Sequence, residues 1–243
     1  EKVVKRIISN LDEVYFPCNC SVPFLETVHD RVMLEVFRGC IRGCRFCQAG
    51  FIYRPVREKS AETVNRQAKC LCENTGYDEI SLSSLSTSDY REIEPLLSKM
   101  LDWTEKSHVS MALPSLRIDN FSEELLEKIN HVRKSGLTFA PEAGTQRLRD
   151  AINKNVTEEE MLSTALKAFQ GGWTSVKLYF MLGLPTETEE DIRGIAELSN
   201  KIAVAYYETV PKEKRNGKGS QTEVRLWKRF LKYSEPILKN TRR

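Results

Sequence analysis

Short apolar runs alternate with longer segments of helical spacing along most of this chain, and this alternation restricts the possible fold more than any other feature. Strands are expected at Val32–Phe37, Glu79–Leu82, Val109–Leu113, Leu137–Ala140 and Ser175–Leu182. Helices are expected over Ala61–Asn74, from Ser88 or Asp89 to about Glu105, from Ser122 to Gly136, in the stretch ending at Phe169, and over Glu187–Tyr207. Right-handed crossovers between parallel strands curl a sheet in one sense. We therefore predict an α/β fold, a partial (β/α)6 TIM-like barrel of parallel strands open on one side, with a flat doubly wound sheet as the alternative.

The domain organisation follows from where this alternation begins and ends. We predict an N-terminal lead-in over residues 1–31, a barrel core over residues 32–208, and a basic linker with a C-terminal segment over residues 209–243. Val224–Trp227 suits a sixth strand, and Leu226–Ser234 suits a short helix, so both alternatives stay open.

Charge is unevenly distributed along the 243 residues. The net charge is +3, but the segment from Thr209 to Arg243 holds eleven Lys or Arg against three Glu, so it carries +8 and the rest carries −5. Such a tail can bind the phosphates of RNA, or it can be a solvated face. Neither a membrane-length apolar run nor a secretory signal is found, so we expect a soluble, cytoplasmic protein without a membrane partner.

Seven cysteines occur in three groups, of which C-x3-C-x2-C at Cys40, Cys44 and Cys47 is the most informative. Thiolates select iron-sulfur clusters or zinc. A structural zinc site needs four ligands, and no further His or Cys lies at zinc-finger spacing. Three thiolates on a cubane cluster leave one iron open to a small molecule. Cys40, Cys44 and Cys47 are thus the candidate metal-binding and catalytic residues.

This cysteine spacing after the first strand, with Phe46 before the last cysteine, resembles the radical S-adenosylmethionine (radical SAM) superfamily. The wider stretch from Val28 to Glu58 resembles a branch whose longer members carry an N-terminal cobalamin-binding domain. The resemblance implies a 4Fe-4S cluster whose open iron binds SAM and whose electron, supplied by a flavodoxin- or ferredoxin-type reductant, cleaves SAM to a 5'-deoxyadenosyl radical. Cobalamin is expected only through a domain that this chain lacks, because no D-x-H-x-x-G motif is found.

The same resemblance assigns further residues to SAM. Phe46 and Gly183, in Gly183-Leu184-Pro185, would lie near the adenine, and Glu142 would bind the ribose. The remaining assignments are Ser84 and Ser86 for the amino group, and Lys154 for the carboxylate, with Arg117 and Lys177 as rival cations. Tyr179 departs from the family pattern, in which a carboxylate is common. Each polar residue also has a structural alternative: a serine-rich loop, a surface lysine, or for Glu142 an ion pair with Arg147 or Arg149.

The function implied is modification of RNA or a protein, of the methyl or methylthio transfer type. A metal-stabilised nucleic-acid-binding module without catalysis is the alternative. The C-x-C pairs Cys18 with Cys20 and Cys70 with Cys72 could ligate a second cluster. We expect packed or incidental thiols there instead. Cys70 and Cys72 are expected on a helix, where positions i and i+2 point to different faces, and Cys18 and Cys20 belong to the lead-in, where the family pattern does not require cysteine.

Overall fold

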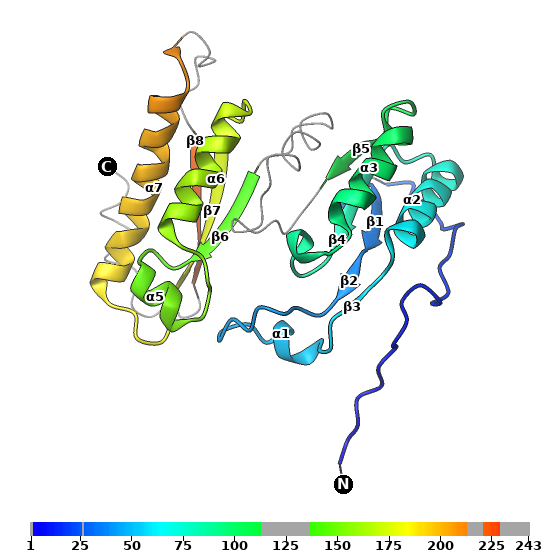
Figure 1. Ribbon diagram of the computed structural model, residues 1–243, viewed down its shortest axis with the longest axis horizontal. Helices are drawn as coiled ribbons and strands as arrows, with labels where there is room; N and C mark the ends of the chain where they lie inside the picture. The colour runs from blue at the N-terminus through cyan, green and yellow to red at the C-terminus, as the bar shows by residue number, and fades with distance from the viewer. Residues whose placement is uncertain (1, 26, 113–136, 213–220, 229–243) are drawn as a thin grey trace. The chain divides into compact units, whose positions relative to one another are not determined.

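The structure is a computed structural model that describes residues 2–25, 27–112, 137–212 and 221–228, the last of these by their backbone alone (Figure 1). The chain divides into two compact units. Unit 1 consists of Glu1–Arg42 and Cys47–Ser135, and unit 2 consists of Gly43–Phe46 and Gly136–Arg243. The short cysteine-loop segment Gly43–Phe46 therefore packs with the C-terminal half of the chain.

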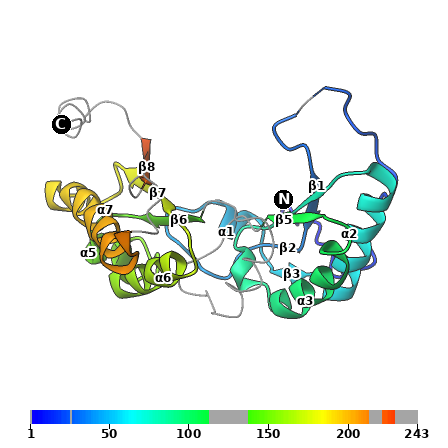
Figure 2. The same ribbon diagram turned by 90° about the horizontal axis from the view of Figure 1, so that it is seen from above.

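Unit 1 is built on a parallel three-stranded sheet in the order β1-β4-β5. Its strands are β1 (Val32–Glu35), β4 (Glu79–Ser83) and β5 (Ser110–Ala112), and an antiparallel pair joins β2 (Phe37–Arg38) to β3 (Arg57–Glu58). Its helices are α1 (Ala49–Ile52), α2 (Ala61–Thr75), the 3-10 turn η1 (Thr87–Asp89) and α3 (Ile93–Thr104). Figure 2 shows α2 and α3 on one side of the sheet. Leu34, Ile80 and Leu96 are fully buried in its core.

Unit 2 repeats this plan with a parallel sheet in the order β6-β7-β8. The strands are β6 (Leu137–Glu142), β7 (Ser175–Leu182) and β8 (Gln221–Lys228), and the helices are α5 (Gln146–Ala151), α6 (Glu158–Gln170) and α7 (Glu189–Thr209). Val176, Leu178 and Phe180 alternate with less buried residues along β7, which gives the strand one face in the core. The other face carries Lys177 and Tyr179.

The predicted α/β class with parallel strands is confirmed, although the described strands form two parallel three-stranded sheets and one antiparallel pair and no closed barrel. Ser60 caps α2 by accepting from the Thr63 amide, and Gly76 ends that helix in the left-handed conformation. Thr157 and Glu160 form a capping box at the start of α6. β8 bears out the strand alternative for Val224–Trp227. The predicted helix from Ser122 lies outside the described residues, and the domain limits at 32 and 208 stay predictions.

One predicted helix start was wrong. Helix α3 begins at Ile93, because Ser88 and Asp89 belong to η1. The Asp89 carboxylate accepts hydrogen bonds from the side chains of Ser86 and Arg42, so it is not available to cap a helix.

The expectation of unpaired thiols outside the cysteine loop was also partly wrong. Cys18 of the lead-in and Cys70 of α2 form a disulfide, with Cα atoms 5.6 Å apart. That separation lies in the normal disulfide range. Cys20 and Cys72 are free, and burial raises the pKa of the Cys72 thiol to about 11. Cys72 therefore stays protonated and weakly reactive at neutral pH.

A search of the described helices found none that combines the length and the apolar character of a membrane span.

Gly144 marks a close approach of α7 to the loop after β6 in unit 2. A Cβ built on Gly144 would lie 2.3 Å from the Ile195 amide nitrogen and 2.5 Å from the Asp191 carbonyl oxygen, both in α7. These atoms are backbone, so α7 must shift to admit a side chain.

We therefore predict that Gly144→Ala lowers the free energy of unfolding by about 1 to 3 kcal/mol, which is the usual cost of overpacking. Gly50→Ala is the matched control, because nothing lies within 4 Å of a Cβ built there. Denaturant unfolding of both variants checks the prediction, and equal stabilities would contradict the close packing of α7 on Gly144.

Candidate active site

Cys40 follows a backbone turn at Gly39 that no other residue fits. Gly39 has φ of +94°, and a Cβ there would lie 2.8 Å from the Tyr53 carbonyl oxygen and 3.0 Å from the Val56 Cα. Any L-side chain would meet both a disfavoured conformation and a backbone clash. The turn leads the chain from β2 into the cysteine loop, where Cys40 is a free, half-buried thiol.

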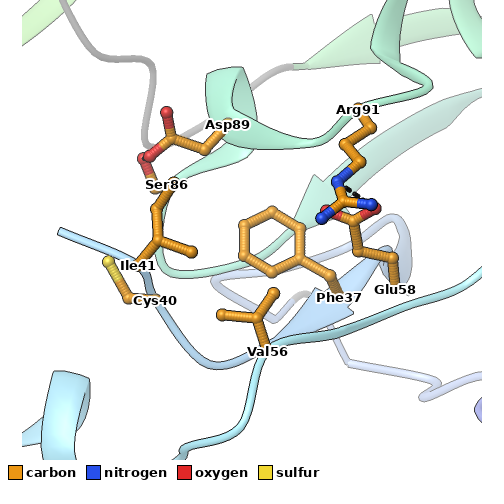
Figure 3. A pocket seen from close by; sticks show the side chains of 8 residues that line it. All are labelled: Phe37, Cys40, Ile41, Val56, Glu58, Ser86, Asp89 and Arg91. Atoms are coloured by element: carbon orange, nitrogen blue, oxygen red, sulfur yellow. Dashed lines mark hydrogen bonds and ion pairs between the residues drawn. The ribbon is translucent and has the colours of Figure 1, made fainter.

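Cys40 opens onto a cavity of about 290 Å³ inside unit 1. Figure 3 shows Cys40, Ser86 and Asp89 on one side of the Phe37 ring and an ion pair of Arg91 with Glu58 on the other. Burial raises the pKa of Glu58, and the charge of Arg91 opposes that rise. The cavity thus places a thiol beside a hydroxyl and a carboxylate, all in unit 1.

Asp89 is the residue of this cavity that the sequence did not identify as functional. Its carboxylate is only 7% exposed, accepts from the Ser86 hydroxyl at 2.7 Å and from Arg42 Nε at 2.8 Å, and also bonds the Arg42 Nη2. A bidentate guanidinium–carboxylate pair is strong and directional. The sequence does contain a signal for this role, because Asp89 is an acidic residue in the serine-rich loop after a strand. From the sequence alone, Asp89 was instead placed at the start of a helix.

The two predicted serines lie in the loop after β4 and have different surroundings. Ser86 is buried and lines the cavity of Cys40. Ser84 lies 2.9 Å, oxygen to oxygen, from the Thr87 hydroxyl and lines a different, larger cleft. Only Ser86 therefore shares a cavity with Cys40.

The Gly43–Phe46 segment is fixed to the turn after α5. The Arg45 amide donates to the Ile152 carbonyl at 2.9 Å, and the Asn153 side-chain amide donates to the Gly43 carbonyl at 2.9 Å. Cys44 lies within this segment and is buried, Cys47 lies just after it and is half-buried, and neither forms a disulfide. The backbone around Cys44 is thereby held by two hydrogen bonds.

Phe46 packs against a small apolar cluster of unit 2. The cluster contains Ala143, Leu148, Ile152 and Leu184, with Met181 at its edge. Leu184 belongs to the Gly183-Leu184-Pro185 turn, so two segments predicted to lie near the adenine come together within one unit. The Gly183 amide is engaged by the Glu187 carboxylate at 2.7 Å.

Glu142 and Lys154, predicted separately, form an ion pair. Lys154 Nζ lies 3.3 Å from Glu142 Oε1, and the side chains are 12% and 17% exposed. Burial raises the pKa of Glu142, and the nearby Lys154 charge lowers it in part. The expected alternatives are not found, because Arg147 pairs with Asp191 and Arg149 donates to backbone carbonyls of Ala143 and Val156.

The structure says less about Lys177 and Arg117, the alternatives to Lys154 for the SAM carboxylate. Lys177 lies on the less buried face of β7 together with Tyr179. Arg117 lies outside the described residues. Among the residues that are described, no three His, Cys, Asp or Glu side chains already converge in a metal-binding arrangement.

Comparison with known proteins decides the family. A family model described as the radical SAM superfamily matches residues 34–199. The chain belongs to the radical SAM superfamily. The predicted resemblance is confirmed, and with it the use of a 4Fe-4S cluster and SAM that characterises this family.

The radical SAM relatives include modification enzymes. An uncharacterized protein of Methanocaldococcus jannaschii is 36% identical over 70% of this chain and 37% of its own length. The threonylcarbamoyladenosine tRNA methylthiotransferase of Aquifex aeolicus is 26% identical over 86% of this chain and 52% of its own length. This chain therefore spans between about a third and about half of these relatives.

The fold also matches solved radical SAM structures. The radical SAM methyltransferase TsrM from Kitasatospora setae, with cobalamin and a 4Fe-4S cluster bound, gives a TM-score of 0.59 at 12% identity, covering 81% of this chain and 36% of that one. The cobalamin-dependent SAM radical enzyme OxsB gives 0.54 at 13% identity, covering 68% of this chain and 26% of that one. At these identities the likeness establishes the fold.

The cysteine loop suits an iron-sulfur cluster by its donor chemistry. Three cysteines that form no disulfide occur within eight residues, Cys40 faces a cavity, and the Cys18–Cys70 disulfide lies elsewhere. Thiolates are the ligands that iron-sulfur clusters take. The residues present therefore fit the cluster of the radical SAM family.

The Glu142–Lys154 pair generates a prediction about stability. Removal of one partner from a largely buried ion pair leaves an uncompensated charge. We predict that Lys154→Met lowers the free energy of unfolding by about 1 to 3 kcal/mol at about pH 7. Near pH 4 the cost shrinks, because Glu142, whose folded pKa is raised, is then protonated in the folded protein and largely protonated in the unfolded chain.

Lys201→Met is the matched control for this measurement. Lys201 pairs with Glu158 at the surface, with side chains 51% and 36% exposed, so its removal is expected to cost less than about 1 kcal/mol. Denaturant titrations at both pH values make the comparison. A Lys154→Met cost that does not change with pH would contradict the electrostatic role of the pair.

Proposed function

We propose that this chain is the radical-generating core of an enzyme that modifies RNA or a protein by methyl or methylthio transfer. In this proposal Cys40, Cys44 and Cys47 hold a 4Fe-4S cluster, leaving one iron open for SAM. When bound and reduced by a flavodoxin- or ferredoxin-type donor, the cluster supplies the electron that cleaves SAM to a 5'-deoxyadenosyl radical. The observation that best supports the proposal is the group of three cysteines after the first strand, none of them in a disulfide, within a match to the radical SAM family over residues 34–199.

The protein groups around the reaction would bind and orient SAM. Ser86, fixed by Asp89, is assigned to the SAM amino group, because a carboxylate-backed hydroxyl and the carboxylate itself can both accept from an ammonium. Ser84 was assigned to the same group, but it lines a different cleft from Cys40, so Ser86 and Asp89 have the stronger support.

Unit 2 supplies the other proposed contacts. Glu142 can accept from the ribose hydroxyls, and Lys154 can pair with the SAM carboxylate; their mutual ion pair holds both side chains in place before SAM binds. Phe46 and Gly183 are assigned to the adenine. Lys177 and Arg117 remain alternatives for the carboxylate.

Methyl or methylthio transfer is inferred from the relatives. Their printed names include tRNA methylthiotransferases and radical SAM methyltransferases. Cobalamin would come from a part of a longer protein, because the neighbours that bind it are much longer than this chain.

The cluster assignment predicts the effect of Cys44→Ala. Loss of one of the three thiolates leaves the ligand set incomplete. We therefore expect the iron and sulfide contents after anaerobic reconstitution to fall to background. The dithionite-driven release of 5'-deoxyadenosine from SAM is expected to fall to background as well. Cys70→Ala is the control, because Cys70 is in the disulfide with Cys18, and it keeps both. Deoxyadenosine formation by Cys44→Ala would refute the assignment, and loss of iron in Cys70→Ala would indicate a second cluster.

The role of Asp89 predicts a binding defect without loss of the cluster. Asp89→Asn removes the negative charge that faces the proposed ammonium site, so the apparent affinity for SAM falls about tenfold while iron content is kept. Asp78→Asn, exposed at the other end of β4, is the matched control and leaves SAM affinity unchanged. Isothermal titration of reconstituted protein with SAM measures both. Equal affinities of the two variants would remove Asp89 from the site.

A further inference from the structure

A second and larger cleft in unit 1 adjoins the cavity that contains Cys40. It measures about 560 Å³, within the usual range of ligand sites. The lead-in forms one wall with Lys5 and Arg6, and Tyr53, just after α1, and Arg57, at the start of β3, also line the cleft. Phe37 lines both the cleft and the Cys40 cavity. A molecule in this cleft would therefore extend toward the cysteine loop.

Hydrogen bonds hold the lead-in against the segment that follows α1. Lys5 Nζ donates to the Arg54 carbonyl at 3.1 Å and also to the Ile52 carbonyl. Arg57 donates to the Ile8 carbonyl at 3.3 Å and to the Pro55 carbonyl at 3.0 Å. Lys5 of the lead-in thus bonds the backbone of the segment after α1, and Arg57 bonds the backbone of the lead-in. These reciprocal hydrogen bonds join two segments about fifty residues apart and fix the wall of the cleft.

The cleft carries an excess of positive charge. Arg38 is neutralised, because its Nε lies 2.8 and 3.0 Å from the two oxygens of Glu35. Lys5, Arg6 and Arg57 have no carboxylate partner within ion-pair distance among the residues that the structure describes. Residues 1–208 carry −5 overall, so three unneutralised cations around one cleft are not explained by composition. Such a site favours a polyanion.

Exposed rings accompany these cations. Tyr53 lines the cleft and is 49% exposed, with Lys5 Nζ 5.9 Å from its ring centroid. Phe51, on the preceding turn, is 59% exposed and has Arg54 over its ring. Cations that follow a phosphate backbone beside rings that stack on bases are the combination that binds single-stranded nucleic acids. An acidic peptide would use the cations but not the rings.

We infer that this cleft binds the phosphate backbone and a base of a single-stranded nucleic acid, and so positions an RNA substrate beside the cysteine loop. The inference rests on the proposed function for its choice of RNA, and it places RNA contacts in the lead-in and the Tyr53 loop as well as in the basic tail. Lys5, Arg6 and Arg57 contact phosphates, and Tyr53 stacks on a base.

Fluorescence anisotropy with the full 243-residue chain and a labelled oligouridine RNA of about 12 nucleotides tests the inference. Lys5→Ala with Arg6→Ala is expected to weaken binding on the order of tenfold at about 0.1 M salt, and to flatten the slope of log affinity against log salt by about 1.4, since each lost contact removes about 0.7. The matched control, Arg66→Ala with Lys106→Ala, changes the net charge equally at two exposed positions and stays within about twofold.

A second pair of variants tests the ring. Tyr53→Leu is expected to weaken binding about fivefold or more, Tyr53→Phe keeps it, and Tyr15→Leu, at an exposed tyrosine of the lead-in, leaves it unchanged. DNA of the same length shows whether the sugar matters, and binding of either strand supports the assignment. Poly-glutamate that competes as well as the RNA, or equal losses in the control variants, would overturn it.

The readouts separate this inference from the proposed function. The Lys5→Ala with Arg6→Ala variant must keep its iron content and its release of 5'-deoxyadenosine. Suppose that the chain cleaves SAM and that the Lys5→Ala with Arg6→Ala variant binds RNA as tightly as the control variant Arg66→Ala with Lys106→Ala. That result refutes RNA binding in the cleft and leaves the proposed function standing. A chain that binds RNA through the cleft but holds no cluster refutes the proposed function alone.

Discussion

The parallel pairing of β1 with β4 positions most of the chemistry-bearing groups of unit 1. Glu35 lies opposite Ser83 in the register, and the Val36 amide donates to the Ser83 carbonyl at 3.0 Å, one step beyond the paired strands. Because parallel strands end at the same edge, the loop after β1 and β2 and the loop after β4 leave the sheet together. The Gly39 turn then carries Cys40 to the cavity, and the η1 turn carries Asp89 to the same cavity.

The same constraint operates in unit 2 on different residues. Glu142 ends β6, and Gly183 follows β7, its parallel neighbour. Lys154 reaches Glu142 from the turn after α5, and that turn also holds the cysteine-loop segment through Ile152 and Asn153. The residues that we propose for the SAM ribose, carboxylate and adenine therefore lie at neighbouring strand ends of unit 2 and in the turn after α5.

Local signals predicted much of this structure, and long-range contacts account for what they missed. The bounds of β7 match the expected Ser175–Leu182, because a buried apolar run and its flanking turns are encoded within ten residues. Asp89 was assigned to a helix start because its partner Arg42 lies 47 positions away. The Cys18–Cys70 disulfide and the cleft formed by Lys5 and Arg57 also join distant segments. The three cysteines that we propose to hold the cluster could be identified from the sequence because their spacing is local and chemically specific.

We propose that three thiolates of one loop hold a cluster with an open iron that binds SAM. Electron paramagnetic resonance of the anaerobically reconstituted, reduced chain, recorded with and without SAM, is the decisive measurement, because only a ligand on the open iron alters the cluster signal strongly. We expect a reduced 4Fe-4S signal whose g values shift when SAM is added. A colourless zinc-loaded protein, or a cluster signal that SAM leaves unchanged, would contradict it.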